Sequence, residues 1–189
     1  MAETRSTMMP LDTPAPDFQL QDTEGRSVSL HDFDEAKGLL VAFICNHCPF
    51  VRHIQHELAR FADEFQPKGL AVVAINSNDA VAHPDDSPEA MAEERRRVGY
   101  NFPYLFDETQ AVAKAYGAAC TPDFFLFDRD RRLVYRGRFD GSSPGRAEPV
   151  TGADLRAAAK AMLAGDEISA EQYPSLGCNI KWKPGNEPS

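Results

Sequence analysis

The chain has 189 residues, of which 42% are hydrophobic, and its formal net charge is -9 at pH 7. This length and composition predict one domain with a substantial core, and the acidic balance argues against nucleic acid or a membrane as a partner. No stretch approaches the length of a membrane-spanning helix. The N-terminus has no apolar signal core, so we expect a cytoplasmic protein. In that compartment, two cysteines three residues apart are more often catalytic or metal-binding than structural.

The elements expected in chain order alternate between strands and helices. Residues 1–13 form an irregular N-terminal arm, residues 14–165 form the domain, and residues 166–189 form a C-terminal tail. Within the domain we expect, in order, a hairpin turning at Gly25, a strand over 39–44, a helix from Pro49 to Phe65, a strand over 70–78, a helix over 88–100, a strand over 102–107, a helix over 109–116, a hairpin over 123–141 and a helix over 152–165. This order predicts an α/β fold with a mixed central sheet flanked by helices.

The residues from Gly38 to Phe65 contain the clearest functional signal. The apolar run over 39–44 is typical of a buried strand, and an amphipathic helix follows from Pro49. Proline is favoured at the first position of a helix, so Pro49 makes Cys48 the capping residue. The unpaired N–H groups and partial positive charge at a helix start favour a thiolate, which is the reactive form of cysteine. We therefore predict Cys48 as the attacking thiol and Cys45, at the end of the strand, as its disulfide partner.

Two neighbouring residues are candidates for adjusting the thiolate. His47 directly precedes Cys48, and a cation or hydrogen-bond donor there would stabilise the charged sulfur. Arg52 lies about one turn into the helix and could add positive potential. The alternatives are an exposed polar residue in a turn for His47 and a solvated helix face for Arg52. Metal binding is a further alternative for the two cysteines, completed by a nearby histidine (His47, His53 or His56). A structural zinc site would need a second cysteine pair at zinc spacing, which the sequence lacks.

Several motifs together resemble the thioredoxin fold. The segments "APDFQLQDTEGRSVSL", "CNHCPFVRHI", "YGAACTPDFFLFDRDRRLVYRGRFDG" and "GCNIKWKPGNEP" are similar to those of peroxiredoxin-like redoxins, relatives of the AhpC/TSA proteins. The resemblance implies a thioredoxin fold with an N-terminal β-hairpin. It also implies a cis peptide bond between Thr121 and Pro122, which would face the active-site cysteines and offer backbone groups to a substrate. Cys120 would lie near the site, and Cys178 would reach it if the tail folds back, so both are candidate resolving cysteines.

The sequence also departs from the peroxiredoxin pattern. Cys48-Pro49 matches the peroxidatic pair of that family, but Cys45 stands at its threonine position and Val41 at its upstream proline position. Those missing groups orient the peroxide, so the resemblance implies weak peroxidase activity. The buried acid of thioredoxins is replaced by Ala42.

These observations predict a thiol–disulfide oxidoreductase that needs no cofactor. Cys48 would attack a substrate disulfide and Cys45 would displace the reduced product. The expected partners are protein or small-molecule disulfides, with hydroperoxides as an alternative, and a thiol reductant such as thioredoxin. The alternative functions are a peroxiredoxin-like thiol peroxidase and a metal-binding module.

Overall fold

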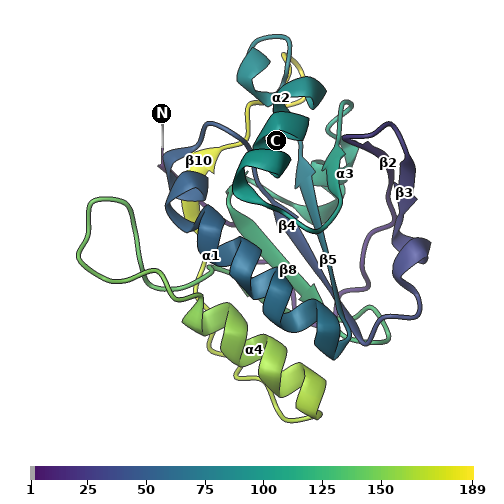
Figure 1. Ribbon diagram of the computed structural model, residues 1–189, viewed down its shortest axis with the longest axis vertical. Helices are drawn as coiled ribbons and strands as arrows, with labels where there is room; N and C mark the ends of the chain where they lie inside the picture. The colour runs from purple at the N-terminus through teal and green to yellow at the C-terminus, as the bar shows by residue number, and fades with distance from the viewer. Residues whose placement is uncertain (1–2) are drawn as a thin grey trace.

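The computed structural model describes residues 3–189, and Figure 1 shows a mixed sheet crossed by helices. The strands are β1 (Glu3–Arg5), β2 (Gln19–Asp22), β3 (Ser27–Ser29), β4 (Gly38–Phe43), β5 (Leu70–Asn76), β6 (Tyr104–Phe106), β7 (Cys120–Thr121), β8 (Asp123–Phe127), β9 (Leu133–Gly137) and β10 (Leu176–Asn179). The α-helices are α1 (Pro49–Phe65), α2 (Pro88–Val98), α3 (Ala111–Tyr116) and α4 (Ala153–Ala164). Short 3-10 helices cover Leu30–Phe33, Gln66–Lys68 and Pro84–Asp86.

The central sheet has seven strands in the order β3-β2-β6-β5-β4-β8-β9. Strand β4 pairs in parallel with β5, β5 pairs in parallel with β6, and the remaining neighbours are antiparallel. The sheet is therefore mixed, and the thioredoxin fold expected from the sequence is confirmed. The N-terminal hairpin, the α/β alternation and the final hairpin all form where the hydrophobic periods predicted them.

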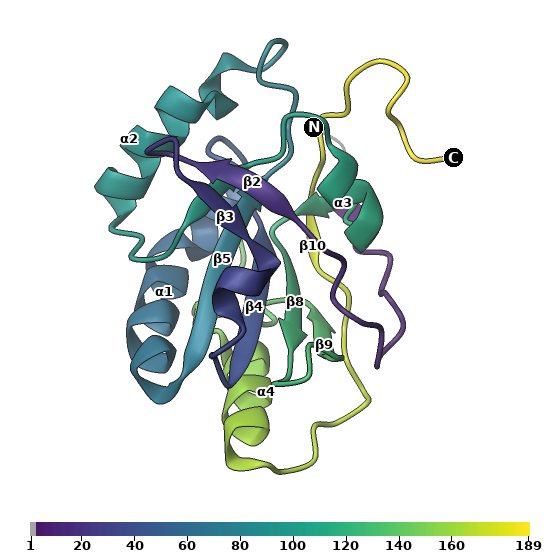
Figure 2. The same ribbon diagram turned by 90° about the vertical axis from the view of Figure 1, so that its right-hand side faces the viewer.

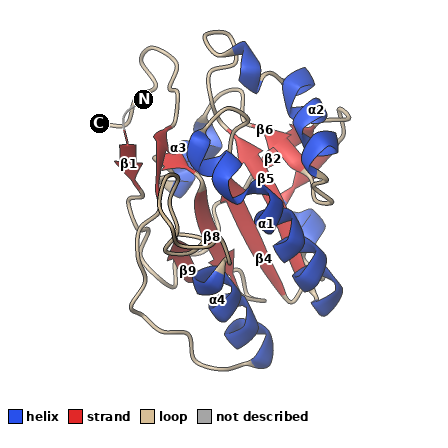
Figure 3. Ribbon diagram, turned by 60° about the vertical axis from the view of Figure 1, so that its left-hand side comes forward, coloured by secondary structure: helices blue, strands red, loops and turns tan. Residues whose placement is uncertain are grey.

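Two cores lie on the two faces of the sheet, because side chains alternate along each strand. In β4, Leu40 and Ala42 pack with α1 and α4, whereas Leu39, Val41 and Phe43 pack on the opposite side, which α3 covers. Figure 2 shows α1 and α3 on opposite sides of the sheet, and Figure 3 shows α1 and α4 side by side across its strands. All six residues of β4 are buried, as expected for a central strand.

The two chain ends form a second, smaller sheet that the sequence did not predict. Its strand order is β1-β10-β7, and both pairings are antiparallel. The prediction of an irregular N-terminal arm is thus wrong at Glu3–Arg5, and the C-terminal tail contains a strand. Strands of two to four residues carry too little hydrophobic alternation to be recognised in a sequence. Among residues 3–189, no helix combines the length and apolar character needed to cross a lipid bilayer.

Candidate active site

Cys48 lies where the central strand passes to the first helix. It is the capping residue of α1, its backbone is extended, and Pro49 occupies the first helical turn. The side chain is completely buried, as are those of Cys45, Cys120 and Cys178 to within a few per cent, and all four thiols are free. The sequence-based position of Cys48 at a helix start is therefore confirmed.

The sulfur of Cys48 contacts the C-terminal tail. The Sγ atoms of Cys48 and Cys178 lie 2.7 Å apart, although the two residues are separated by 130 positions in the sequence. A disulfide has an S–S length of about 2.05 Å, so an approach of about 0.7 Å would bring these sulfurs to bonding distance. The structure thus brings together the predicted nucleophile and one of the two candidate resolving cysteines.

Thr121 contacts both cysteines of the Cys-X-X-Cys motif. Its carbonyl oxygen lies 3.3 Å from the Sγ of Cys48 and accepts a hydrogen bond from that thiol in its protonated form, and its Oγ1 lies 3.3 Å from the Sγ of Cys45. The peptide bond from Thr121 to Pro122 is cis, as the resemblance implied. Cys120, in contrast, directs its thiol at the carbonyl oxygen of Pro122, 3.9 Å away, and not at another sulfur.

Strand β10 holds Cys178 in register with Thr121. The pair Cys178–Thr121 lies opposite in the antiparallel ladder between β10 and β7, and Glu3 of β1 lies opposite Cys178 on its other side. Gly177 permits this close approach, because a Cβ added there would lie 2.0 Å from the carbonyl oxygen of Thr121. The tail is therefore held by pairing with two neighbouring strands, and glycine at position 177 leaves room for that pairing.

This packing leads to a prediction for Gly177→Ala. Overpacking of this kind costs about 1–3 kcal/mol, which corresponds to a roughly 5- to 150-fold rise in the population with β10 detached. We expect iodoacetamide to modify Cys48 correspondingly faster, measured by mass spectrometry of the intact protein. Gly141→Ala is the matched control, because its added Cβ would meet no atom closer than 3.8 Å. Equal modification rates in the two variants would contradict a role for this contact in covering Cys48.

Burial and the contacts among the thiols give the cysteines of the site very different pKa values. The hydrogen bond from Cys45, then those from the Cys178 thiol and the backbone N–H groups of Val51 and Cys178, lower the pKa of Cys48 to about 5, against the opposing effect of burial. The same contact with Cys48, together with burial, raises the pKa of Cys45. Burial and the contact with Cys48 raise the pKa of Cys178 to about 12. These shifts favour one thiolate at neutral pH, Cys48, beside the protonated thiols of Cys45 and Cys178.

A buried carboxylate fixes the turn that carries the cysteines. Asp86 is fully buried and accepts hydrogen bonds from the backbone N–H of Asn46 at 2.8 Å and from the side-chain amides of Asn76 and Asn78. Its other close contact is with Nδ1 of His47, at 2.6 Å. This bond raises the pKa of His47, whereas the hydrogen bonds to Asp86 lower the pKa of that carboxyl against the effect of burial.

The predicted roles of His47 and Arg52 remain predictions. His47 directs its Nδ1 at Asp86, so the carboxylate balances the charge of the ring in its protonated form. Arg52 is exposed, and its Nε donates to the carbonyl oxygen of Asn46 at 3.1 Å, which fastens the turn to the helix. Asp86 was missed by the sequence analysis, because it lies in a polar loop and only its burial distinguishes it from its neighbours.

One group of side chains has the composition of a metal site. Donor atoms of Cys45, His47 and Asp86 all lie within 4.8 Å of one another. The alternative predicted from the sequence used Cys48 in place of Asp86. The oxygens of Asp86 already accept several hydrogen bonds from amide groups, so a metal ion would compete with that network.

Two comparisons with known proteins match about two thirds of this chain. The model of the AhpC/TSA family matches residues 11–136. The thiol-disulfide oxidoreductase ResA of Geobacillus thermodenitrificans is 30% identical over 130 residues, which are 69% of this chain and 70% of that protein.

Solved structures extend the comparison to the whole chain. A hypothetical protein from Sinorhizobium meliloti is 55% identical, with a TM-score of 0.95 over 96% of this chain and 100% of that chain. An uncharacterized conserved protein from Geobacillus kaustophilus is 53% identical, with a TM-score of 0.96 over 98% of each chain. A thiol:disulfide interchange protein of the thioredoxin family from Chlorobium tepidum shares the fold, with a TM-score of 0.62 at 18% identity over 82% of this chain and 99% of that chain. With its thioredoxin fold and its match to the family model, the chain belongs to the AhpC/TSA family of redoxins, and its relatives include thiol–disulfide oxidoreductases.

Proposed function

We propose that this protein catalyses thiol–disulfide exchange with the Cys48 thiolate as the nucleophile. The observation that carries the proposal is the sulfur of Cys48 at the start of α1, 2.7 Å from a second thiol. The lowered pKa of Cys48 supports it, because the thiolate is the attacking species. The ResA relatives support the same reaction class.

The exchange proceeds in two steps. Cys48 attacks one sulfur of a substrate disulfide, forms a mixed disulfide and releases the first thiolate product. A second cysteine then loses its proton and attacks the Cys48 sulfur, which releases the second thiolate and leaves an intramolecular disulfide. The substrate gains two electrons from the two protein thiols, and an external dithiol of the thioredoxin type restores the reduced protein.

Two cysteines are candidates for the second step. The sequence predicts Cys45, and the hydrogen bond that lowers the pKa of Cys48 supports it. The distance of 2.7 Å favours Cys178. We propose Cys178 as the principal partner, with Cys45 as the alternative.

Reduction of hydroperoxides is the second candidate function. The AhpC/TSA family match and the Cys48-Pro49 pair favour it. The Cys48 thiolate would become a sulfenic acid, which would condense with Cys178 and release water.

We further propose that the protein works in the cytoplasm.

Disulfide mapping tests the proposed reaction. We expect one equivalent of hydroxyethyl disulfide to convert the reduced protein to a form with a Cys48–Cys178 bond, detected by peptide mass spectrometry after free thiols are alkylated. In Cys178→Ala we expect a Cys48–Cys45 bond or a persistent mixed disulfide on Cys48. A Cys48–Cys45 bond in the protein without substitutions would support the pair predicted from the sequence. If Cys48 were not modified at all, the result would contradict the proposed function, and metal analysis would be the next experiment.

A further inference from the structure

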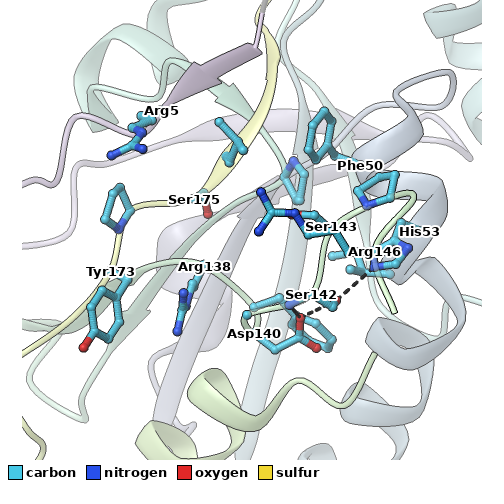
Figure 4. Close-up of a pocket in the computed structure, with 17 residues that line it drawn as sticks. Arg5, Phe50, His53, Arg138, Asp140, Ser142, Ser143, Arg146, Tyr173 and Ser175 are labelled. Carbon is cyan, nitrogen blue, oxygen red and sulfur yellow. Dashed lines mark hydrogen bonds between the residues drawn. The ribbon is translucent and has the colours of Figure 1, made fainter. Parts of the chain in front are cut away.

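A pocket lies on the side of α1 and β10, and some of its lining residues are sequence neighbours of the buried thiols, although no cysteine itself lines it. It has a volume of about 340 Å³, and Figure 4 shows the side chains around it. Its apolar wall includes Phe50, Pro122 and Leu176. Each of these residues is close in sequence to the site: Phe50 follows Cys48 by two positions, Pro122 follows Thr121, and Leu176 precedes Cys178 by two positions. Because strand residues two apart share a face, Leu176 and Cys178 lie on the same side of β10.

The pocket is cationic, although the protein as a whole is acidic. Three arginines line it: Arg5, Arg138 and Arg146. In Figure 4, Arg5 and Arg138 lie toward the left of the view, and the Arg146 label lies toward the right. Arg5 and Arg146 form none of the ion pairs found among residues 3–189. Arg138 is paired with Asp154, so the excess positive charge at the pocket comes from Arg5 and Arg146, in contrast to the net charge of -9 of the whole chain.

The acidic residue in the pocket does not neutralise these arginines. Asp140 directs its carboxylate at its own loop, where it accepts hydrogen bonds from the backbone N–H groups of Ser142, Thr151 and Gly152 at 2.7–2.8 Å. Arg138 is oriented by Asp154, 2.6 Å from its Nε, and by stacking on Tyr173, 4.4 Å from its ring centre. It is thereby fixed in place, and its other guanidinium N–H groups remain available to a ligand.

The strand pairing next to the cysteines leaves no place for an extended peptide as the ligand. In proteins that bind an extended segment, the segment adds to an open strand edge. Here β10 already pairs with β7 at Thr121, and β1 pairs with the other edge of β10. An incoming polypeptide therefore finds no open edge at Thr121 while the tail is in place, which leaves the pocket as the candidate site for a small substrate.

We infer that this pocket binds the carboxylate end of a low-molecular-weight disulfide and thereby selects small anionic disulfides as substrates. The inference rests on the proposed thiol–disulfide exchange. Guanidinium groups bind carboxylates with strong, directional hydrogen bonds, and the apolar wall accommodates the carbon chain between carboxylate and sulfur. Cys48 attacks the disulfide, the first thiolate product leaves, and Cys178 displaces the second, with electrons and protons balanced as above.

Three disulfides that share the same two-carbon arms test the inference: dithiodipropionate (anionic), hydroxyethyl disulfide (neutral) and cystamine (cationic). The measurement is the second-order rate of oxidation of the reduced protein, followed by mass spectrometry. The overall negative charge of the protein would by itself favour cystamine. We expect the reverse order, with dithiodipropionate at least about 10-fold faster than cystamine, because the arginines act at close range.

Substitution of the arginines localises the effect. We expect Arg146→Ala and Arg5→Ala each to slow the reaction with dithiodipropionate by roughly 10-fold and to leave hydroxyethyl disulfide within about twofold of the original rate. Arg96→Ala is the matched control, because Arg96 is an exposed arginine outside the pocket. Equal effects of all three variants would overturn the inference.

The outcomes also separate the inference from the proposed function. Reaction with hydroxyethyl disulfide but without preference for dithiodipropionate would refute the anionic pocket and retain thiol–disulfide exchange. No reaction with any of the three disulfides would refute both. A faster reaction with a disulfide-bonded protein than with dithiodipropionate would show that β10 leaves β7 for a polypeptide, which also overturns the inference.

Discussion

Replacing Cys48 with serine is expected to lower the rate of disulfide reduction by at least about 1,000-fold, because a hydroxyl group is a far weaker nucleophile than a thiolate. The substitution exchanges one sulfur atom for oxygen, and the carbonyl oxygen of Thr121 is placed to accept a hydrogen bond from the buried hydroxyl, so the fold should persist. The rate is measured as the formation of oxidised dithiothreitol, followed by the ultraviolet absorbance of its cyclic disulfide, with hydroxyethyl disulfide as the substrate and after subtraction of the uncatalysed reaction.

Cys120→Ser is the matched control for that experiment. Cys120 is equally buried, but its thiol is directed at a backbone carbonyl oxygen and burial raises its pKa. Its removal should leave the rate within about threefold, as expected for a residue that stabilises structure without reacting. If Cys48→Ser retained more than a tenth of the activity, another cysteine would have to be the nucleophile.

The second large effect concerns pH. With a pKa of about 5, Cys48 is almost fully ionised at pH 7, whereas an ordinary cysteine with a pKa of about 8.5 is only about 3% ionised. We therefore expect about 30-fold more thiolate than an ordinary cysteine provides. The pKa is lowered, so the thiolate is present above about pH 5 and is lost as the pH falls through that value. Ultraviolet absorbance of the thiolate measures this transition.

The absorbance step should correspond to one thiolate per chain. Of the four cysteines in the sequence, the other three have raised pKa values, so none contributes below pH 8. Cys45→Ala and Cys178→Ala each remove a thiol that donates to the Cys48 sulfur, so each should move the midpoint toward that of an ordinary cysteine. A midpoint that stays near pH 5 in both variants would mean that the helix start alone lowers the pKa.

Much of the fold could be predicted from the sequence because the long elements have clear periods. The strand before Cys45, the helix from Pro49 to Phe65 and the hairpin after Pro122 each bury a continuous face, and their hydrophobic patterns identify them. The site position followed from the same signals, since Pro49 marks the helix start and hence the place of Cys48.

The partner of Cys48 could not be ranked from the sequence. Cys45 is near in the chain, whereas Cys178 reaches the site through strand pairing with Thr121. That pairing depends on backbone hydrogen bonds and on the missing side chain at Gly177, and neither produces a hydrophobic pattern. For the same reason, the sequence did not indicate the strand at Glu3–Arg5, which covers the outer edge of β10.

Polar residues that become important only when buried or gathered were also missed. Asp86 resembles any loop aspartate until its burial and its amide donors are known. Arg5 comes from β1, whereas Arg138 and Arg146 come from the connection between β9 and α4, and the three meet only around the pocket. The contributions of such residues are set by three-dimensional placement, which local periodicity does not encode.

The pairing of both chain ends over Cys48 has a consequence for synthesis. A domain folds largely as its residues leave the ribosome, but Cys178 is synthesised 130 residues after Cys48. Until then the newly made domain has Cys48 next to Cys45 without the strand that covers it. Nascent chains that still lack β10 should therefore be more easily oxidised at this thiol than chains in which β10 has paired with β7, and the emergence of β10 closes that interval.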